Sequence, residues 1–148
     1  MDRKNAVSGL VVLILALIPF GIFGCGQKRI VDNIDLPFVN DPDVIGEWNS
    51  VDLVAEPALF TAGIQLFKGD LYMQGLTFLA GGKILWDNKT DAPWFTWTKG
   101  VVMHSGDKTA SAYTIKDISG AKYMFFEWKS GDYTIRHIKP KYYVLKKK

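Results

Sequence analysis

Hydrophobic and polar residues alternate in short runs over most of the chain from residue 44 to residue 148. Pairs of residues that favour turns separate these runs at intervals of about ten residues. The same region contains neither heptads nor a long stretch of helical period. This pattern predicts an all-β domain in which each strand lies beside the strand before it.

Four pairs of turn residues lie between β-rich runs: Gly81–Gly82, Ser105–Gly106, Ser119–Gly120 and Ser130–Gly131. Such pairs suit tight hairpin turns, whose central residues need a positive φ. The runs between them predict about eight or nine strands. The expected strands are residues 46–54, 71–79, 83–86, 95–105, 113–115, 123–128, 133–138 and 142–145, where 95–105 is one strand or two strands broken at Gly100.

The turns also predict the register of the last hairpins. If Ser119–Gly120 and Ser130–Gly131 are both two-residue loops, Met124 faces Ile115 on one side and His137 on the other. One face of the sheet then carries large, mostly apolar side chains: Tyr113, Ile115, Met124, Phe126, Trp128, Tyr133, Ile135 and His137. The other face is mixed and charged, with Glu127 and Arg136 on it. We expect the first face to point inward.

An antiparallel sheet of about eight strands with one apolar face predicts a small up-and-down barrel, because closure removes the exposed edges. The interior of such a barrel is filled by side chains or holds one small ligand. The eight inward residues therefore either form the core or line a ligand cavity, and their size favours a filled core. Residues 56–60 are expected to form a short helix or lid over the mouth, or else a packed connection.

The first 24 residues have the layout of an export signal. Arg3 and Lys4 precede residues 6–24, which carry no charge. A run of this length is close to the roughly 20 residues that span a bilayer as a helix, and the charged start is also typical of a secretory signal. Pro19 and Gly21 interrupt the run late, which favours a cleavable signal peptide over an uncleaved signal anchor.

Cys25 follows this run directly and is the single cysteine, so the chain has no intramolecular disulfide. The sequence from Ile22 to Cys25 resembles the lipobox of bacterial lipoproteins, although Phe23 stands where a small residue is usual. The resemblance implies that Cys25 is acylated and begins the mature protein. In the alternative, the leader is an uncleaved anchor and Cys25 is a thiol at the interface. Both alternatives place the remaining chain on the extracytoplasmic face of a membrane.

Composition limits the remaining function classes. Residues 25–43 are polar and acidic and predict a tether, followed by a barrel domain at residues 44–148. A hydrophobic content of 48% supports a folded core, while a net charge of +3 is too small to argue for nucleic acid. Seven acids lie between residues 30 and 67, and five lysines lie in the last ten residues; we interpret both runs as solvated surface.

No group of residues has the spacing of an active site. His104, Ser105 and Asp107 include the residue types of a hydrolase triad, but one tight turn cannot place the base between nucleophile and acid. The chain shows no metal-ligand spacing, and we expect neither a metal nor another cofactor. These observations predict a protein that is not an enzyme.

Gly46-Glu47-Trp48 stands at the start of the first expected strand and resembles the Gly-x-Trp signature of the lipocalin (calycin) family. In that family the Trp closes one end of the barrel beneath a basic residue. The resemblance implies this role for Gly46 and Trp48, and Arg136 is the candidate for the basic residue.

A wider resemblance covers most of the chain after residue 35. Residues 36–42, 75–83, 97–100 and 127–136 resemble a bacterial extracytoplasmic module that occurs as a free lipoprotein and appended to β-lactam-sensing-type membrane regulators. It implies a lipocalin-like fold and an envelope address. We therefore expect a membrane-anchored binding module for a small apolar ligand or an envelope component, with the ligand at the end of the barrel that bears His137. The alternative is an accessory module with a filled barrel that binds a membrane sensor or protease.

Overall fold

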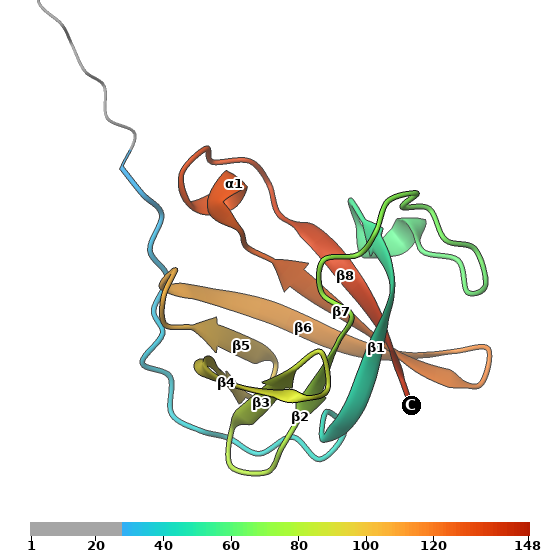
Figure 1. Ribbon diagram of the computed structural model, residues 1–148, viewed down its shortest axis with the longest axis horizontal. Coiled ribbons are helices and arrows are strands. Elements are labelled where there is room, and N and C mark those ends of the chain that lie inside the picture. Colours follow the sequence, from blue (N-terminus) through green and yellow to red (C-terminus); the bar gives the residue numbers. More distant parts are fainter. Residues whose placement is uncertain (1–27) are drawn as a thin grey trace, which may run out of the picture.

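A computed structural model describes residues 28–148, so the expected leader and Cys25 lie outside the described residues. Within residues 28–148 the chain forms eight strands and two short helical segments (Figure 1). The strands are β1 (Gly46–Val54), β2 (Gly75–Phe78), β3 (Lys83–Trp86), β4 (Thr90–Thr98), β5 (Val101–His104), β6 (Thr109–Ile118), β7 (Ala121–Trp128) and β8 (Lys141–Lys147). The helical segments are the 3-10 helix η1 (Pro57–Leu59) and the helix α1 (Gly131–Thr134).

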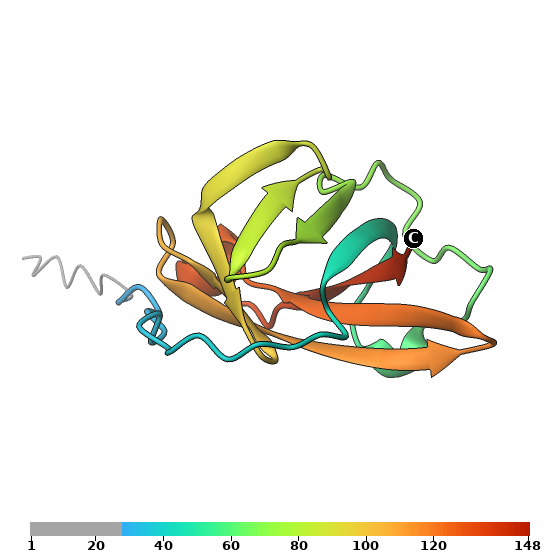
Figure 2. The ribbon, with the colours of Figure 1, turned by 90° about the horizontal axis from the view of Figure 1, so that it is seen from below.

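The strands form a closed barrel in which each strand pairs antiparallel with the next (Figures 1 and 2). β8 pairs with β1 and completes the ring, from Trp48 opposite Lys147 to Val54 opposite Tyr142. The register of this last pair shifts by one residue between Ser50 and Asp52. The structure thus confirms the predicted all-β, up-and-down barrel.

The β6–β7 hairpin has the predicted turn and register. Ser119 and Gly120 form a two-residue turn with φ of 50° and 78°, the left-handed region that Gly adopts without a steric penalty. Ile115 pairs with Met124, and Tyr113 pairs with Phe126, as expected. Alternation then turns these four side chains toward the inside of the barrel.

The expected strand at residues 133–138 is wrong. The Ser130 hydroxyl accepts a hydrogen bond from the backbone N–H of Asp132 at 3.3 Å and caps α1, so Ser130–Gly131 begins a helical turn rather than a hairpin. Ser is as suitable at a helix N-cap as in a hairpin turn, and Asp132 in the first turn favours the helix further. The strand that pairs with β7 is β8, ten residues later in the chain than the expected turn.

This difference changes every predicted partner across β7 and β8. Met124 faces Leu145 instead of His137, Phe126 faces Tyr143 instead of Ile135, and Trp128 faces Lys141 instead of Tyr133. Ile135 is 57% exposed and His137 is also exposed. Glu127 and Arg136 were expected together on the outer sheet face, but Arg136 follows α1 and lies in no strand.

The barrel has an apolar interior and a second apolar cluster on its outside. The interior is filled by fully buried side chains that include Trp48, Phe78, Trp97, Met124 and Leu145. The outer cluster contains Val54, Tyr123, Phe125 and Val144. Phe60, which follows η1, covers the outer cluster with ring centroids 5.0 Å from Tyr123 and 5.7 Å from Phe125. Residues 56–60 are therefore a packed connection that contains a short 3-10 helix, and they lie on the outer wall rather than over the mouth.

A buried carboxylate holds the long connection between β1 and β2. Asp52 is fully buried, and its side chain accepts hydrogen bonds from the backbone N–H groups of Leu53, Leu66 and Phe67 at 2.8–3.0 Å. Hydrogen bonds to a charged acceptor are stronger than neutral ones, and these donors would otherwise need water. Asp52 thus fixes a segment that has little regular structure of its own.

Residues 28–43 are the described part of the expected tether, and we call them the N-terminal strap. The strap packs along the barrel (Figure 2). The strap begins beside α1, where the Ile30 N–H donates to the Thr134 carbonyl oxygen, and then passes the start of β6, where the Asp32 N–H donates to the Lys108 carbonyl oxygen. It ends beside the β4–β5 turn, where Val39 N–H donates to Thr98 Oγ1 and Phe38 packs edge-on against Trp97. Asp41 accepts a hydrogen bond from the Tyr113 hydroxyl at 3.0 Å.

The first prediction tests the corrected register in the fragment 28–148, which contains all the strands of the barrel and both apolar clusters. Phe126→Ala removes a buried ring and should lower the free energy of unfolding by about 3–5 kcal/mol. Ile135→Ala should lower it by less than about 0.5 kcal/mol, because this side chain is mostly in water. Urea denaturation measures both changes. Equal losses from the two substitutions would contradict the register described here.

The second prediction concerns alkaline stability. Burial raises the pKa of the Tyr113 hydroxyl above its usual value, and the negative charge of Asp41 adds to the rise; burial shifts the Tyr143 pKa in the same direction. The unfolded chain therefore loses these protons first, so the free energy of unfolding should fall as pH rises above about 10. The free energy of unfolding of the Tyr113→Phe variant should fall less steeply over this pH range. Parallel profiles for the two proteins, measured by urea denaturation from pH 8 to 11, would show that Tyr113 does not contribute.

Candidate functional site

The two ends of the barrel differ in structure. β1 begins where β8 ends, because Trp48 pairs with Lys147, and we call this the closed end. Since neighbouring strands run in opposite directions, β5 and β7 finish at the other end, at His104 and Trp128, and we call this the open end.

Trp48 fills the closed end. Its side chain is fully buried, and its Nε1 donates a hydrogen bond to the Val44 carbonyl oxygen at 2.7 Å. The Nζ of Lys147 lies 5.2 Å from the centre of the indole ring and donates to the Asp43 carbonyl oxygen. A cation at this distance from an aromatic face is attracted by the ring quadrupole. Trp48 thus has a basic residue over it.

That basic residue is Lys147, and the expectation that Arg136 covers Trp48 is wrong. Arg136 is 72% exposed in its side chain and pairs with Asp132 at 3.1 Å, four residues earlier. The prediction failed because it placed Arg136 in a strand. Gly46 does lie beside Lys147: a Cβ at this position would be 3.7 Å from Lys147 Cε.

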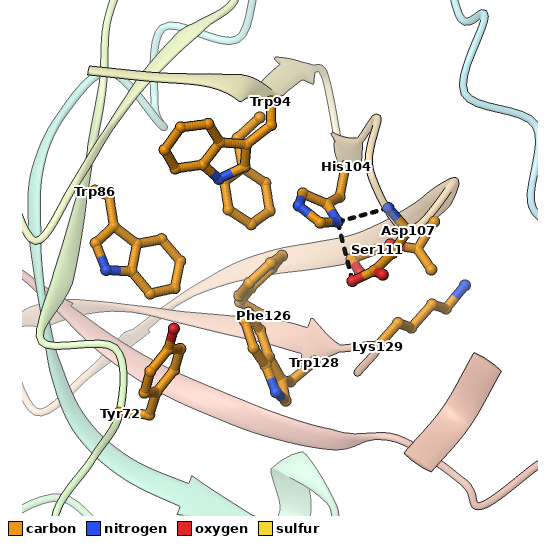
Figure 3. Close-up of a pocket in the computed structure, with 11 residues that line it drawn as sticks. Tyr72, Trp86, Trp94, His104, Asp107, Ser111, Phe126, Trp128 and Lys129 are labelled. Atoms are coloured by element: carbon orange, nitrogen blue, oxygen red, sulfur yellow. Dashed lines mark hydrogen bonds and ion pairs between the residues drawn. The ribbon is translucent and has the colours of Figure 1, made fainter. Parts of the chain in front are cut away.

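The open end contains a pocket with a volume of about 260 Å³ (Figure 3). Side chains from β3 to β7 and from the connections before β2 and after β5 and β7 converge on it. The lining residues are Tyr72, Trp86, Trp94, Phe95, His104, Asp107, Thr109, Ser111, Phe126, Trp128 and Lys129. The barrel is therefore filled at its closed end and hollow at its mouth.

Aromatic rings form one wall of the pocket. Trp86 stacks on Phe95 with an interplanar angle of 8° and a centroid separation of 5.6 Å. Tyr72 and Trp128 pack against the same indole at 5.8 and 6.2 Å. Trp94 and Tyr72 remain 43% and 77% exposed, so two aromatic side chains face solvent beside an open pocket. The wall offers flat apolar surfaces to a ligand.

Polar groups form the opposite wall (Figure 3). His104 Nδ1 lies 3.1 Å from both the backbone N and the Oδ2 of Asp107. When Nδ1 accepts the Asp107 N–H, the proton of a neutral imidazole is on Nε2, which leaves that nitrogen as a donor. Arg29 of the N-terminal strap pairs with Asp107 Oδ1 at 2.8 Å. His104 is therefore held in place by the turn after β5.

Lys129 is the second charged group of this wall. Its Nζ donates to Asp32 Oδ2 at 2.9 Å and to the Ala110 carbonyl oxygen at 2.7 Å, and it lies 3.6 Å from Glu127 Oε2. Burial lowers the pKa of the Lys129 ammonium. The hydrogen bond to Asp32 and the negative charges of Glu127 and Asp32 together raise this pKa by more, so the net shift is upward. The charges of the wall are thus balanced by protein groups, which favours an uncharged ligand.

The eight residues expected to line a ligand cavity are in three different places. Phe126 and Trp128 line the pocket. Tyr113, Ile115 and Met124 belong to the barrel core or pack against it. Tyr133, Ile135 and His137 lie in α1 and the segment that follows it.

The expected position of His137 at the ligand-binding mouth is wrong. The side chain is exposed, and its Nε2 lies 3.0 Å from the Lys28 carbonyl oxygen. The pocket is on the side of Trp128 and Lys129, close to the Ser130–Gly131 turn that we expected at the opposite end.

Most residues of the pocket, unlike Phe126 and Trp128, are not among those predicted from the sequence. Trp86, Phe95 and His104 each lie at or near the mouth, and the β4–β5 register pairs Phe95 with His104. Their position at the ends of strands could have predicted this, because the last inward residues before each turn at the open end form the mouth. Tyr72 and Trp94 had no such signal, since one precedes β2 in an irregular segment and the other depends on the path of β4.

The other chemical candidates do not form an active-site geometry in the described residues. The Ser105 hydroxyl donates to the Trp94 carbonyl oxygen at 3.3 Å rather than to His104. Within residues 28–148, no three His, Cys, Asp or Glu side chains come together as a metal site. None of the helices in this part of the chain has the length and apolarity of a membrane span.

We compared the chain with known proteins. The chain has no significant match among family models, curated proteins or solved structures.

Proposed function

We propose that this protein is a non-enzymatic, membrane-anchored extracytoplasmic module that binds a small, flat, uncharged ligand at the open end of its barrel. The aromatic pocket carries the proposal. Binding sites for small molecules are usually concave and apolar with a few polar groups, and this pocket combines stacked rings with the His104 and Ser111 side chains.

The size of the pocket limits the ligand. A volume of about 260 Å³ is slightly below the roughly 300–1,000 Å³ of sites for drug-sized molecules. Trp48, Phe78 and Met124 fill the barrel below the mouth, so a ligand has no deeper space to enter. These limits favour a small aromatic molecule that stacks on the Trp86 and Trp94 side and remains partly in water.

The membrane address rests on the leader and on the lipobox resemblance of residues 22–25. A single acyl chain gives only marginal attachment, so stable anchoring takes further acyl chains or an uncleaved span. The kinship with the lipocalin-like lipoprotein module is part of this proposal. Eight meandering strands and a Trp–cation pair at the closed end support it.

A second candidate function is the binding of a protein partner at the same mouth. Exposed Tyr72 and Trp94 favour it, because Tyr and Trp are enriched at interfaces. This candidate differs from the first in one respect: it requires no saturable uptake of a small molecule.

The third prediction tests the pocket with N-phenyl-1-naphthylamine, a small neutral probe that joins a phenyl ring to a naphthalene, titrated into fragment 28–148. The probe should bind saturably and quench the pocket tryptophans. Trp94→Ala removes one ring of the aromatic wall and should weaken binding at least about fivefold. The anionic analogue 1-anilinonaphthalene-8-sulfonate should bind more weakly than the neutral probe, because the charges of the pocket are already paired.

Leu59→Ala is the matched control for this titration. Leu59 is 54% exposed, about as much as Trp94, and lies in η1, away from the pocket. Its substitution should leave probe binding unchanged. Absence of saturable binding, or equal weakening by the two substitutions, would remove the small-ligand function and leave partner binding as the better candidate.

The fourth prediction concerns the anchor. In a bacterial host the mature chain should begin at Cys25 and sediment with membranes. Cys25→Ser should yield soluble protein or an unprocessed precursor, whereas Ser8→Ala in the leader should behave as the parent chain does. Mass spectrometry of the N-terminus and membrane flotation measure the result. A Cys25→Ser chain that stays on membranes at the mature size would refute acylation.

A further inference from the structure

Residues 28–30 and 135–141 form one surface, which we call the basic–apolar patch. Two isoleucines on it lie mostly in water: Ile135 is 57% exposed and Ile138 is 53% exposed. Single exposed aliphatic residues are common, whereas two of them within four positions of a short loop place an unusual amount of apolar surface in water.

Hydrogen bonds hold the two segments of the patch together. The Ile30 N–H donates to the Thr134 carbonyl oxygen at 2.8 Å, and the His137 imidazole contacts the Lys28 carbonyl oxygen at 3.0 Å. The Ile138 N–H donates to the Asp132 carbonyl oxygen at 2.9 Å, which closes the loop after α1. The isoleucines are thus presented by an ordered surface rather than by a free end.

Both segments of the patch also carry basic residues. The two segments carry five of them: Lys28, Arg29, Arg136, Lys139 and Lys141. Three carboxylates, Asp107, Asp132 and Glu56, pair with Arg29, Arg136 and Lys139. These pairs are largely exposed, so each is weak and its cation can exchange the carboxylate for another anion. The patch has more cations than anions, which complements a negatively charged surface.

The position of the patch indicates which surface that is. Lys28 is three residues from Cys25, and an extended chain spans at most about 3.3–3.6 Å per residue, so the patch begins no more than about 11 Å from the expected attachment point. Anionic lipid headgroups lie within that reach. Val31, which is 58% exposed, directly follows the patch in the strap. Leu59 and Ile64 are also exposed but belong to the β1–β2 connection, which Figure 1 shows on the far side of the barrel from the start of the strap.

We propose that the basic–apolar patch rests on the anionic bilayer surface, with Ile135 and Ile138 in the interfacial layer and the basic side chains on lipid phosphates. The inference depends on the proposed membrane anchor. Interfacial binding of this kind combines buried apolar area with about 1 kcal/mol for each Lys or Arg near an anionic surface. Two contacts, an anchor and a patch, fix the orientation of the barrel where an anchor alone does not.

This orientation places the pocket beside the membrane. Arg29 belongs to the patch and pairs with Asp107, which lines the pocket. Figures 1 and 2 show the start of the strap and the β5–β6 turn on the same side of the barrel. The mouth is therefore close to the lipid surface, and an apolar ligand can reach it from the bilayer.

The fifth prediction tests the patch in the full chain, reconstituted in vesicles of phosphatidylglycerol and phosphatidylcholine. A benzoylphenylalanine replaces either Ile138 or, as the control, Ala80, an exposed residue in the β2–β3 turn at the closed end. After irradiation, lipid adducts at position 138 should exceed those at position 80 at least about fivefold. Adding Arg136→Glu and Lys139→Glu, or replacing phosphatidylglycerol by phosphatidylcholine, should remove most of that excess.

Flotation of the same vesicles separates the outcomes. If the full chain does not float with the vesicles, the anchor is wrong and the patch proposal falls with it. If the chain floats but positions 138 and 80 label equally, the anchor stands and the patch alone is overturned. An excess at position 138 that persists without anionic lipid would overturn the role of the basic side chains.

Discussion

Pairing of β1 with β8 closes the sheet, and the positions of the core, the strap and the pocket depend on this closure. An open sheet of this length would leave two edges and one apolar face in water. Closure instead places Trp48 against β8 and Lys147 over its ring, which fills one end. The other end has no such plug and keeps a mouth lined by Trp86 and Trp128.

The N-terminal strap joins the mouth to the rest of the chain through two ion pairs. Asp32 accepts from Lys129, and Arg29 pairs with Asp107, and both partners line the pocket. Lys129 is largely buried, so its charge depends on Asp32 and Glu127. The strap thus supports the polar wall of the pocket, although its sequence is that of a polar linker.

Alternation and turn residues were enough to predict the barrel, because a period of two and the pairs Ser119–Gly120 and Gly81–Gly82 leave few alternatives. They could not distinguish a hairpin from a helix start at Ser130, since one hydroxyl suits both. The choice of a hairpin at Ser130 placed His137 and Arg136 in a strand that does not exist. The pocket was harder to predict still, because it is made by strand ends whose position depends on how the whole barrel tilts. Burial of Asp52 likewise depends on a segment 14 residues away.

Gly75 is one of the few positions of this chain that accept a single residue type. A Cβ at this position would lie 2.3 Å from the Trp48 carbonyl oxygen, a backbone atom that cannot move without disturbing β1. Most other positions need only an apolar or a polar side chain of suitable size, which many residues supply. Descendants of a common ancestor could therefore exchange nearly all their residues and keep the barrel. Kinship among such proteins would then remain visible at a few fixed points, such as a glycine against the neighbouring backbone and a buried aspartate, rather than in overall identity.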